Sequence, residues 1–155
     1  MVVFVFVCLA TMVASAVLER ISPVLNGEML HVICDMGHGE EIVISDANFP
    51  AHSVCENVIR ADGIPAARLL EGIAPLFTLD QYSTPVIMMS PVRGDALDPA
   101  VEVRYRAALG YTNTIERLER QEFYERAKKA RAVIVSGEMA KYGNVILKKG
   151  VVPCD

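Results

Sequence analysis

Beyond the first 18 residues, short runs rich in Val and Ile alternate with longer stretches in which apolar residues recur at helical spacing. The runs predict strands over Glu41–Ser45, Pro85–Ser90, Ala132–Ser136 and Asn144–Leu147, with a shorter strand over Ile115–Leu118. Strands that are apolar at nearly every position are typical of a sheet covered on both faces. The alternation of strands with helices therefore predicts an α/β domain with a mainly parallel sheet.

The helical stretches between these runs predict four helices. They span Glu28–Met36, Pro65–Phe77, Asp98–Leu109 and Arg120–Arg131. Asn26 and Asp98 are predicted N-caps of the first and third of them. In open α/β sheets, ligands collect beyond the carboxyl ends of the strands. This rule directs attention to Asp46, Ser90 and the segment 136–138, which follow three of the predicted strands.

The first 18 residues form an apolar leader without a charged side chain, in which 16 residues are apolar, all but Thr11 and Ser15. Ala14-Ser15-Ala16 resembles a signal-peptide cleavage site, but no Lys or Arg precedes the stretch. The run also falls short of the roughly 20 apolar residues of a membrane span. We favour an extension from an upstream start codon over a signal, and a signal over an anchor. Residues 1–20 are therefore expected to be an N-terminal extension, and residues 21–155 the folded domain.

Composition narrows the classes of function. The net charge is −4, with 52% apolar and 22% charged residues. This balance excludes a disordered chain and gives no reason to expect nucleic-acid binding, which needs a basic surface.

The four cysteines, at positions 8, 34, 55 and 154, show neither Cys-x-x-Cys nor zinc-ligand spacing, so no metal site is expected. Such cysteines are typical of a reducing compartment, and Cys34, with apolar neighbours, is predicted to be buried.

Two positions near the first predicted strand are candidates for chemistry. His38 lies between Gly37 and Gly39, which leave its imidazole unobstructed, and His is the side chain best suited to move protons near neutral pH. The alternative is a helix C-cap with a solvent-facing His. Asp46 follows the strand directly, where it either contacts a ligand or caps a turn.

Four further candidates lie toward the C-terminus. Tyr124 lies in a charged helical stretch, and its phenol is a possible donor beside a site, with core packing as the alternative. Tyr142, Gly143 and Asn144 precede the last predicted strand, where a turn is the simplest interpretation. The candidates include no nucleophile and no metal-ligand cluster. They fit proton transfer on a hydroxylated ligand better than covalent chemistry.

At these residues the chain resembles the sugar mutarotases of the RbsD/FucU family, and in particular the fucose branch. The resemblance runs from Ile21 to Val151, nearly all of the chain after the leader. Its most specific segments are Met36-Gly-His-Gly-Glu-Glu-Ile42, Asp46-Ala-Asn-Phe-Pro50, Ile59-Arg-Ala-Asp-Gly63, Phe123-Tyr-Glu-Arg-Ala127 and Lys141-Tyr-Gly-Asn144. Gly39 and the Asn-Phe-Pro run favour the fucose branch over the ribose pyranase branch.

The resemblance implies a single three-layer, Rossmann-like α/β domain in a cytoplasmic, ring-shaped homo-oligomer, typically a decamer, with sites at subunit boundaries. It implies interconversion of the α and β anomers of L-fucose without a cofactor. The family's proton donor falls on His38, with Tyr124 as a second proton-handling group. Its sugar-contacting residues fall on Asp46, Asp80, Arg120, Tyr124, Tyr142, Gly143 and Asn144. Two alternatives remain, a D-ribose pyranase and a sugar-binding module without turnover.

Overall fold

The computed structural model describes residues 18–154, so the apolar leader up to residue 17 lies outside the described residues. Six strands form one sheet in the order β2-β5-β1-β6-β3-β4. All five predicted strands are confirmed, with no end shifted by more than one residue. The strands are β1 (Glu41–Ser45), β2 (Val58–Ala61), β3 (Val86–Met89), β4 (Glu116–Leu118), β5 (Val133–Ser136) and β6 (Val145–Lys148).

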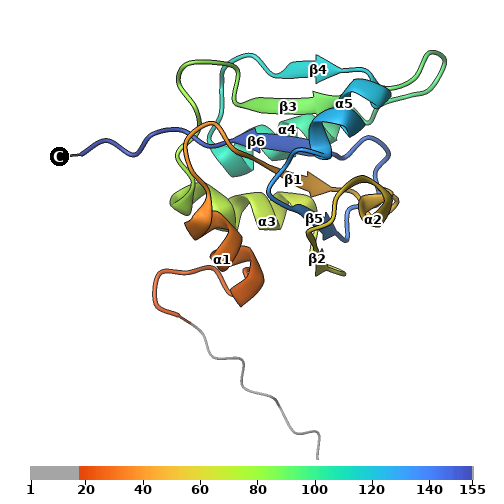
Figure 1. The fold of residues 1–155 in the computed structure, drawn as a ribbon. Helices are drawn as coiled ribbons and strands as arrows, with labels where there is room; N and C mark the ends of the chain where they lie inside the picture. Colours follow the sequence, from red (N-terminus) through yellow and green to blue (C-terminus); the bar gives the residue numbers. More distant parts are fainter. Residues whose placement is uncertain (1–17, 155) are drawn as a thin grey trace, which may run out of the picture.

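One central strand runs against all the others. β1, β5 and β2 are parallel, as are β3 and β4, whereas β6 pairs antiparallel with both β1 and β3. Figure 1 shows the arrowhead of β6 pointing opposite to the rest. Ile44, near the end of β1, pairs with Val145 at the start of β6. The residues that precede β6 therefore lie at the carboxyl ends of β1 and β3.

Helices cover both faces of the sheet, which confirms the predicted three layers (Figure 1). Residues of α1 (Gly27–Asp35), α3 (Ala66–Ile73) and α4 (Pro99–Leu109) share one buried cluster with Ile42 and Ile44 of β1. Those of α2 (Ala51–Val54) and α5 (Arg120–Ala127) share the opposite cluster with Val43. Because successive strand side chains point to opposite faces, a strand apolar at every position serves both clusters.

The ends of the helices follow local chemistry. The Asn26 side chain accepts from the Met29 N–H at 2.9 Å, and that of Asp98 accepts from the Ala100 N–H at 2.9 Å, which confirms both N-caps. α3 ends before its predicted limit in a 3₁₀ turn, Ala74–Leu76, because Pro75 offers no N–H to continue the α-helical pattern. α5 ends at Ala127 instead of residue 131, since the Arg131 N–H donates to the Glu41 carbonyl of β1 at 2.8 Å.

Three features differ from the sequence-based expectations. β2 and α2 were not predicted, because both are only four residues long and β2 exposes Arg60 at the sheet edge. Cys34 is exposed, so the prediction of a buried thiol is wrong. α1 turns Val32 and Ile33 toward the core and presents the next residue to solvent. Among residues 18–154, no helix is long and apolar enough to cross a membrane.

Candidate active site

A polar pocket of about 270 Å³ opens at the carboxyl ends of β1 and β3. Its volume lies just below the roughly 300–1,000 Å³ of sites for drug-sized ligands, so it suits a smaller molecule. Five of the predicted site residues line it together, although they are widely separated in the sequence. The complete lining is Asp46, Asn48, Phe49, Met89, Asp95, Arg120, Tyr124, Lys141, Tyr142 and Asn144.

At the base of the polar pocket, Asp46 and Asn144 form a reciprocal pair. The Asn144 amide donates to Asp46 Oδ2 at 2.7 Å, and the Asp46 backbone N–H donates to Asn144 Oδ1 at 2.9 Å. The Asn48 N–H donates to the other carboxylate oxygen at 2.9 Å. Burial raises the pKa of Asp46, and the negative charge of Glu138 adds to this effect, while the bonds from Asn48 and Asn144 oppose it. The pair presents fixed acceptors of the kind that bind ligand hydroxyl groups.

The loop before β6 is held in an unusual conformation. Tyr142 has a φ of 61°, in the left-handed region that non-glycine residues seldom adopt. Its hydroxyl donates to Asp95 Oδ2 at 2.8 Å and accepts from the Val92 N–H at 3.4 Å, which ties it to the loop after β3. The Tyr142 hydroxyl is the main reason why the pKa of Asp95 lies below its ordinary value.

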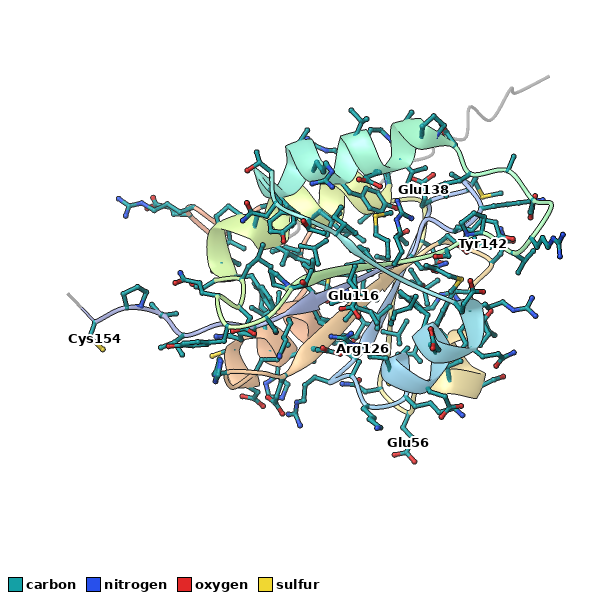
Figure 2. The ribbon with its side chains drawn as sticks, turned by 90° about the horizontal axis from the view of Figure 1, so that it is seen from above. Glu56, Glu116, Arg126, Glu138, Tyr142 and Cys154 are labelled. Atoms are coloured by element: carbon teal, nitrogen blue, oxygen red, sulfur yellow. The ribbon has the colours of Figure 1, made fainter. Side chains whose placement is uncertain are left out.

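Gly143 contributes through its backbone and its lack of a side chain. A Cβ at this position would lie 2.8 Å from Cγ of Glu138 and 3.0 Å from the Ala140 carbonyl oxygen. The Gly143 carbonyl accepts from the buried Tyr105 hydroxyl at 2.8 Å. Figure 2 shows Glu138 and Tyr142 at the same end of the domain, both from the connection between β5 and β6. The predicted turn therefore exists, and its neighbours Lys141, Tyr142 and Asn144 line the polar pocket, whereas Gly143 does not.

α5 carries Arg120 and Tyr124 to the polar pocket. Arg126 anchors this helix on the sheet, with its Nη2 2.6 Å from Glu41 Oε1 and its Nη1 3.2 Å from Glu116 Oε2 (Figure 2). The Tyr124 ring packs edge-on against Phe49, with centroids 5.4 Å apart. Tyr124 is half-buried, so it packs against the domain and also lines the pocket. Arg120, in the first turn of α5, supplies a cationic donor at the rim.

His38 and Asp80 lie at the opposite end of the central strands β1 and β6. His38 precedes β1, and Asp80 is joined to the end of β6 through a bond from its N–H to the Lys148 carbonyl at 3.0 Å. The imidazole Nε2 lies 3.3 Å from Asp80 Oδ1. The five residues of β1, at about 3.3 Å each, separate His38 from Asp46 by roughly 16 Å. Within one chain, the structure therefore does not bring His38 together with Tyr124.

A wider, open depression of about 1050 Å³ lies beside Asp80, lined by residues 77–85 and 111–114. Asp80 is the only charged residue in this lining, and its carboxylate is already occupied by neighbouring protein groups. Several different polar groups converge in the smaller pocket instead, which is the usual property of a ligand site. We therefore identify the polar pocket at the carboxyl ends as the candidate active site.

Sequence reasoning missed several residues of the polar pocket. Asp95 lies in the loop after β3, and Met89 ends that strand. The rule that ligands collect beyond the carboxyl ends of strands could have identified both, because it already indicated Ser90 in the same segment. Lys141 belongs to the segment Lys141–Asn144 of the family resemblance but was not predicted as a site residue, and its Nζ lies 3.4 Å from Asp95 Oδ1. Within the described residues 18–154, no group of three or more His, Cys, Asp or Glu side chains is placed to bind a metal ion.

The chain is similar to known proteins of one family. Residues 19–152 match the RbsD / FucU transport protein family. An L-fucose mutarotase of Actinobacillus pleuropneumoniae serotype 5b (strain L20) is 57% identical over 141 residues, covering 88% of this chain and 98% of that protein.

Solved structures share the fold. The fucose mutarotase of Streptococcus pneumoniae, in complex with L-fucose, superposes with a TM-score of 0.83 at 40% identity, covering 88% of this chain and 100% of that one. FucU of Bifidobacterium longum gives 0.81 at 41% identity, with 86% and 99% covered. RbsD of Bacillus subtilis, complexed with D-ribose, gives 0.69 at 26% identity, with 83% and 95% covered. The match over residues 19–152 and these similarities establish that the chain belongs to the RbsD/FucU family.

Proposed function

We propose that the protein is an L-fucose mutarotase, an isomerase that interconverts the α and β anomers of L-fucose. The observation that carries the proposal is the polar pocket, where two carboxylates, two amides, two phenols, an ammonium and a guanidinium converge. The relative at 57% identity is named an L-fucose mutarotase, which supports this choice of reaction and sugar. The ribose-bound relative is the more distant one, at 26% identity, which makes pyranose–furanose interconversion of D-ribose the second candidate.

Mutarotation needs only proton transfers. A base removes the proton of the anomeric hydroxyl while an acid protonates the ring oxygen, so that the hemiacetal opens to the free aldehyde. Rotation about the bond to the carbonyl carbon and reclosure then give the other anomer. General acid–base catalysis contributes about 10²–10⁴-fold to such a step. In this proposal Asp46 and Arg120 hold sugar hydroxyls, and His38 and Tyr124 move the protons.

The separation of His38 from the polar pocket favours a site shared between two copies of the chain. We propose a homo-oligomer in which His38 of one subunit faces the polar pocket of another, and a ring-shaped decamer as its size. His38 is suited to this role because its side chain is 47% exposed at the domain edge. Symmetric homo-oligomers commonly place functional groups across subunit contacts in this way.

Saturation-transfer NMR on the anomeric protons tests the reaction directly. Irradiation of the α-anomer signal of L-fucose should reduce the β signal in the presence of enzyme, and much less without it. D-ribose and D-galactose are compared in parallel. Exchange confined to the pyranose and furanose signals of ribose would identify a pyranase. Binding of sugar without exchange above the uncatalysed rate would identify a sugar-binding module and refute the proposal.

Subunit mixing tests the shared site. His38→Ala and Arg120→Ala are each expected to be nearly inactive. After unfolding and co-refolding at equal amounts, about one quarter of the sites combine an intact His38 with an intact pocket, because the two come from independently chosen subunits. Activity near a quarter of wild type supports the shared site, and a mixture as inactive as its components shows that both groups act from one chain. Size-exclusion chromatography with light scattering measures the number of subunits.

We further propose that the protein works in the cytoplasm. The thiols of Cys34, Cys55 and Cys154 are all free, as is usual in a reducing compartment. Cell fractionation with an antibody against the protein tests this location, and recovery in an exported fraction would overturn it.

A further inference from the structure

His38 makes its polar contact through one nitrogen only. Its Nε2 lies 3.3 Å from Asp80 Oδ1, and the Tyr82 ring packs edge-on against the imidazole with centroids 5.5 Å apart. Among residues 18–154, the structure gives Nδ1 no hydrogen-bond partner. The side chain of His38 is 47% exposed, whereas that of Asp80 is only 1% exposed. The imidazole is thus attached to the protein at Nε2 and open to its surroundings at the other nitrogen.

Asp80 itself is held by four groups. Oδ2 accepts from the Ser83 hydroxyl at 2.6 Å and lies 3.3 Å from the Lys148 ammonium. Oδ1, the oxygen beside His38, accepts from the Tyr82 N–H at 3.2 Å. Lys148 also donates to the Ser83 hydroxyl oxygen at 2.8 Å, which leaves the Ser83 hydrogen for the carboxylate. We call Asp80, Ser83 and Lys148 the carboxylate clamp.

We propose that the carboxylate clamp keeps the proton of neutral His38 on Nε2, so that Nδ1 is the atom that exchanges a proton with the sugar. This inference rests on the proposed mutarotase function. An ionised carboxylate only accepts hydrogen bonds, so the nitrogen that faces it must carry the hydrogen. Asp80 acts here as a positioning residue, comparable to the Asp that orients the His of a Ser-His-Asp triad.

The chemistry of the clamp supports this tautomer. The Ser83 hydroxyl, the Tyr82 N–H, Lys148 and His38 together hold the pKa of Asp80 well below its ordinary value, although burial opposes them. The acceptor is therefore negatively charged at neutral pH. When Nδ1 takes a proton from a sugar hydroxyl, the resulting imidazolium lies beside this negative charge. When it returns the proton to a sugar oxygen, the Nε2 proton remains in place.

Asp80→Asn tests the assignment, because Lys148 determines how the new amide is oriented. Two donors compete for the single amide oxygen, the Lys148 ammonium on the Oδ2 side and the Tyr82 N–H on the Oδ1 side. Hydrogen bonds from a charged donor are the stronger ones, so we expect the oxygen to turn toward Lys148 and the NH₂ group to face His38. Nε2 must then accept, and the proton moves to Nδ1. We expect anomer exchange to fall by about 10²-fold or more, since the same change in a Ser-His-Asp triad imposes the wrong tautomer and costs about 10⁴-fold.

Solid-state ¹⁵N NMR of histidine-labelled protein at about pH 8.5, where an ordinary imidazole is neutral, shows which nitrogen carries the proton. The signals of His38 are identified as those that disappear from the spectrum of His38→Gln. We expect protonated Nε2 in the wild type and protonated Nδ1 in Asp80→Asn. In Asp80→Asn/Lys148→Met the amide is free to turn back, and both the wild-type tautomer and part of the exchange rate should return.

Asp35→Asn is the matched control. Within the described residues, Asp35 forms the other His–Asp pair, with His31 at 3.5 Å, but both side chains are at least half exposed. This change should alter exchange by less than about twofold. A wild-type His38 protonated on Nδ1 would overturn the inference, even if Asp80→Asn did not fold. A folded Asp80→Asn with normal exchange would overturn it as well. Absence of exchange in the wild type would instead refute the mutarotase function, while the tautomer measurement stays decisive for the clamp.

Discussion

Tyr105→Phe removes one buried hydroxyl that supports the loop of the polar pocket. Tyr105 lies in α4, is fully buried, and donates to the Gly143 carbonyl at 2.8 Å. Burial, reinforced by the negative charges of Glu138 and Asp46, raises the pKa of this phenol. It therefore remains a donor over the whole pH range in which the protein is folded. Phenylalanine keeps the ring and its packing and deletes only this donor.

The structure sets the size of the effect. Gly143 is buried, and within the described residues its carbonyl has no second donor. Leaving such a group unpaired costs about 1–3 kcal/mol of unfolding free energy. For a domain of this size, that lowers Tm by about 4 °C per kcal/mol. The freed carbonyl also loosens Asn144, the partner of Asp46. We expect about a tenfold loss in kcat/KM for L-fucose, within the ~100-fold that a 1 Å displacement can cause.

The assay combines thermal unfolding, followed by circular dichroism, with anomer exchange by saturation-transfer NMR. Tyr111→Phe is the control, because its hydroxyl likewise donates to a backbone carbonyl, that of Thr114 at 2.9 Å. Thr114 is exposed and lines the open depression instead of the polar pocket, so its carbonyl regains water and exchange should not change. If Tyr105→Phe exchanges L-fucose as fast as Tyr111→Phe does, the Tyr105 hydroxyl does not support the site and the reasoning is refuted.

Four further outcomes are expected. His38→Ala should lower exchange at least about tenfold in a folded protein, as loss of a proton-transfer group does; unchanged exchange would remove His38 from the mechanism. Tyr124→Phe should lower exchange while Tm holds, whereas equal activity would leave Tyr124 a packing residue. Because the folded-state pKa of Asp80 lies below its ordinary 3.8, its stabilisation is complete above that value and is lost as pH falls below it. Acid titration followed by circular dichroism should therefore destabilise wild type more than Asp80→Asn. A chain that starts at Leu18 behind a new Met should keep the wild-type oligomer in size-exclusion chromatography and the wild-type exchange rate; loss of either would assign residues 1–17 a part in assembly.

The main strands were predictable because burial on both faces leaves an uninterrupted apolar run. β1, β3 and β5 are buried at nearly every position, so their sequences differ sharply from the helices around them. β2 alternates buried and exposed residues over only four positions and carries an exposed Arg60, which gives too short a pattern to distinguish it from a loop. Sequence therefore located the central strands and the edge strand β4, but missed the edge strand β2.

Part of the site was predictable because the apolar run of a buried strand also shows where that strand ends. Asp46 follows a buried strand, and that position alone indicates the ligand-binding edge. The direction of β6 was not predictable, since an apolar run of four residues reads the same in a parallel or an antiparallel strand. Yet this direction is what places Asn144 beside Asp46. Tyr105 was likewise hidden, because in a helical pattern it counts as one more core residue.

The two central strands also limit how the site can be completed. β1 separates His38 from Asp46, and β6, running the other way, separates Asn144 from Lys148. Both strands are paired on each side and almost wholly buried, so neither bends or shortens without loss of the core. Bringing His38 to Tyr124 within one chain would disrupt the center of a domain whose total stability is about 5–15 kcal/mol. Contact with a second copy needs no such change, because His38 is already exposed. Association is therefore the less costly way to bring His38 to a polar pocket, and subunit mixing is the experiment that decides between the two.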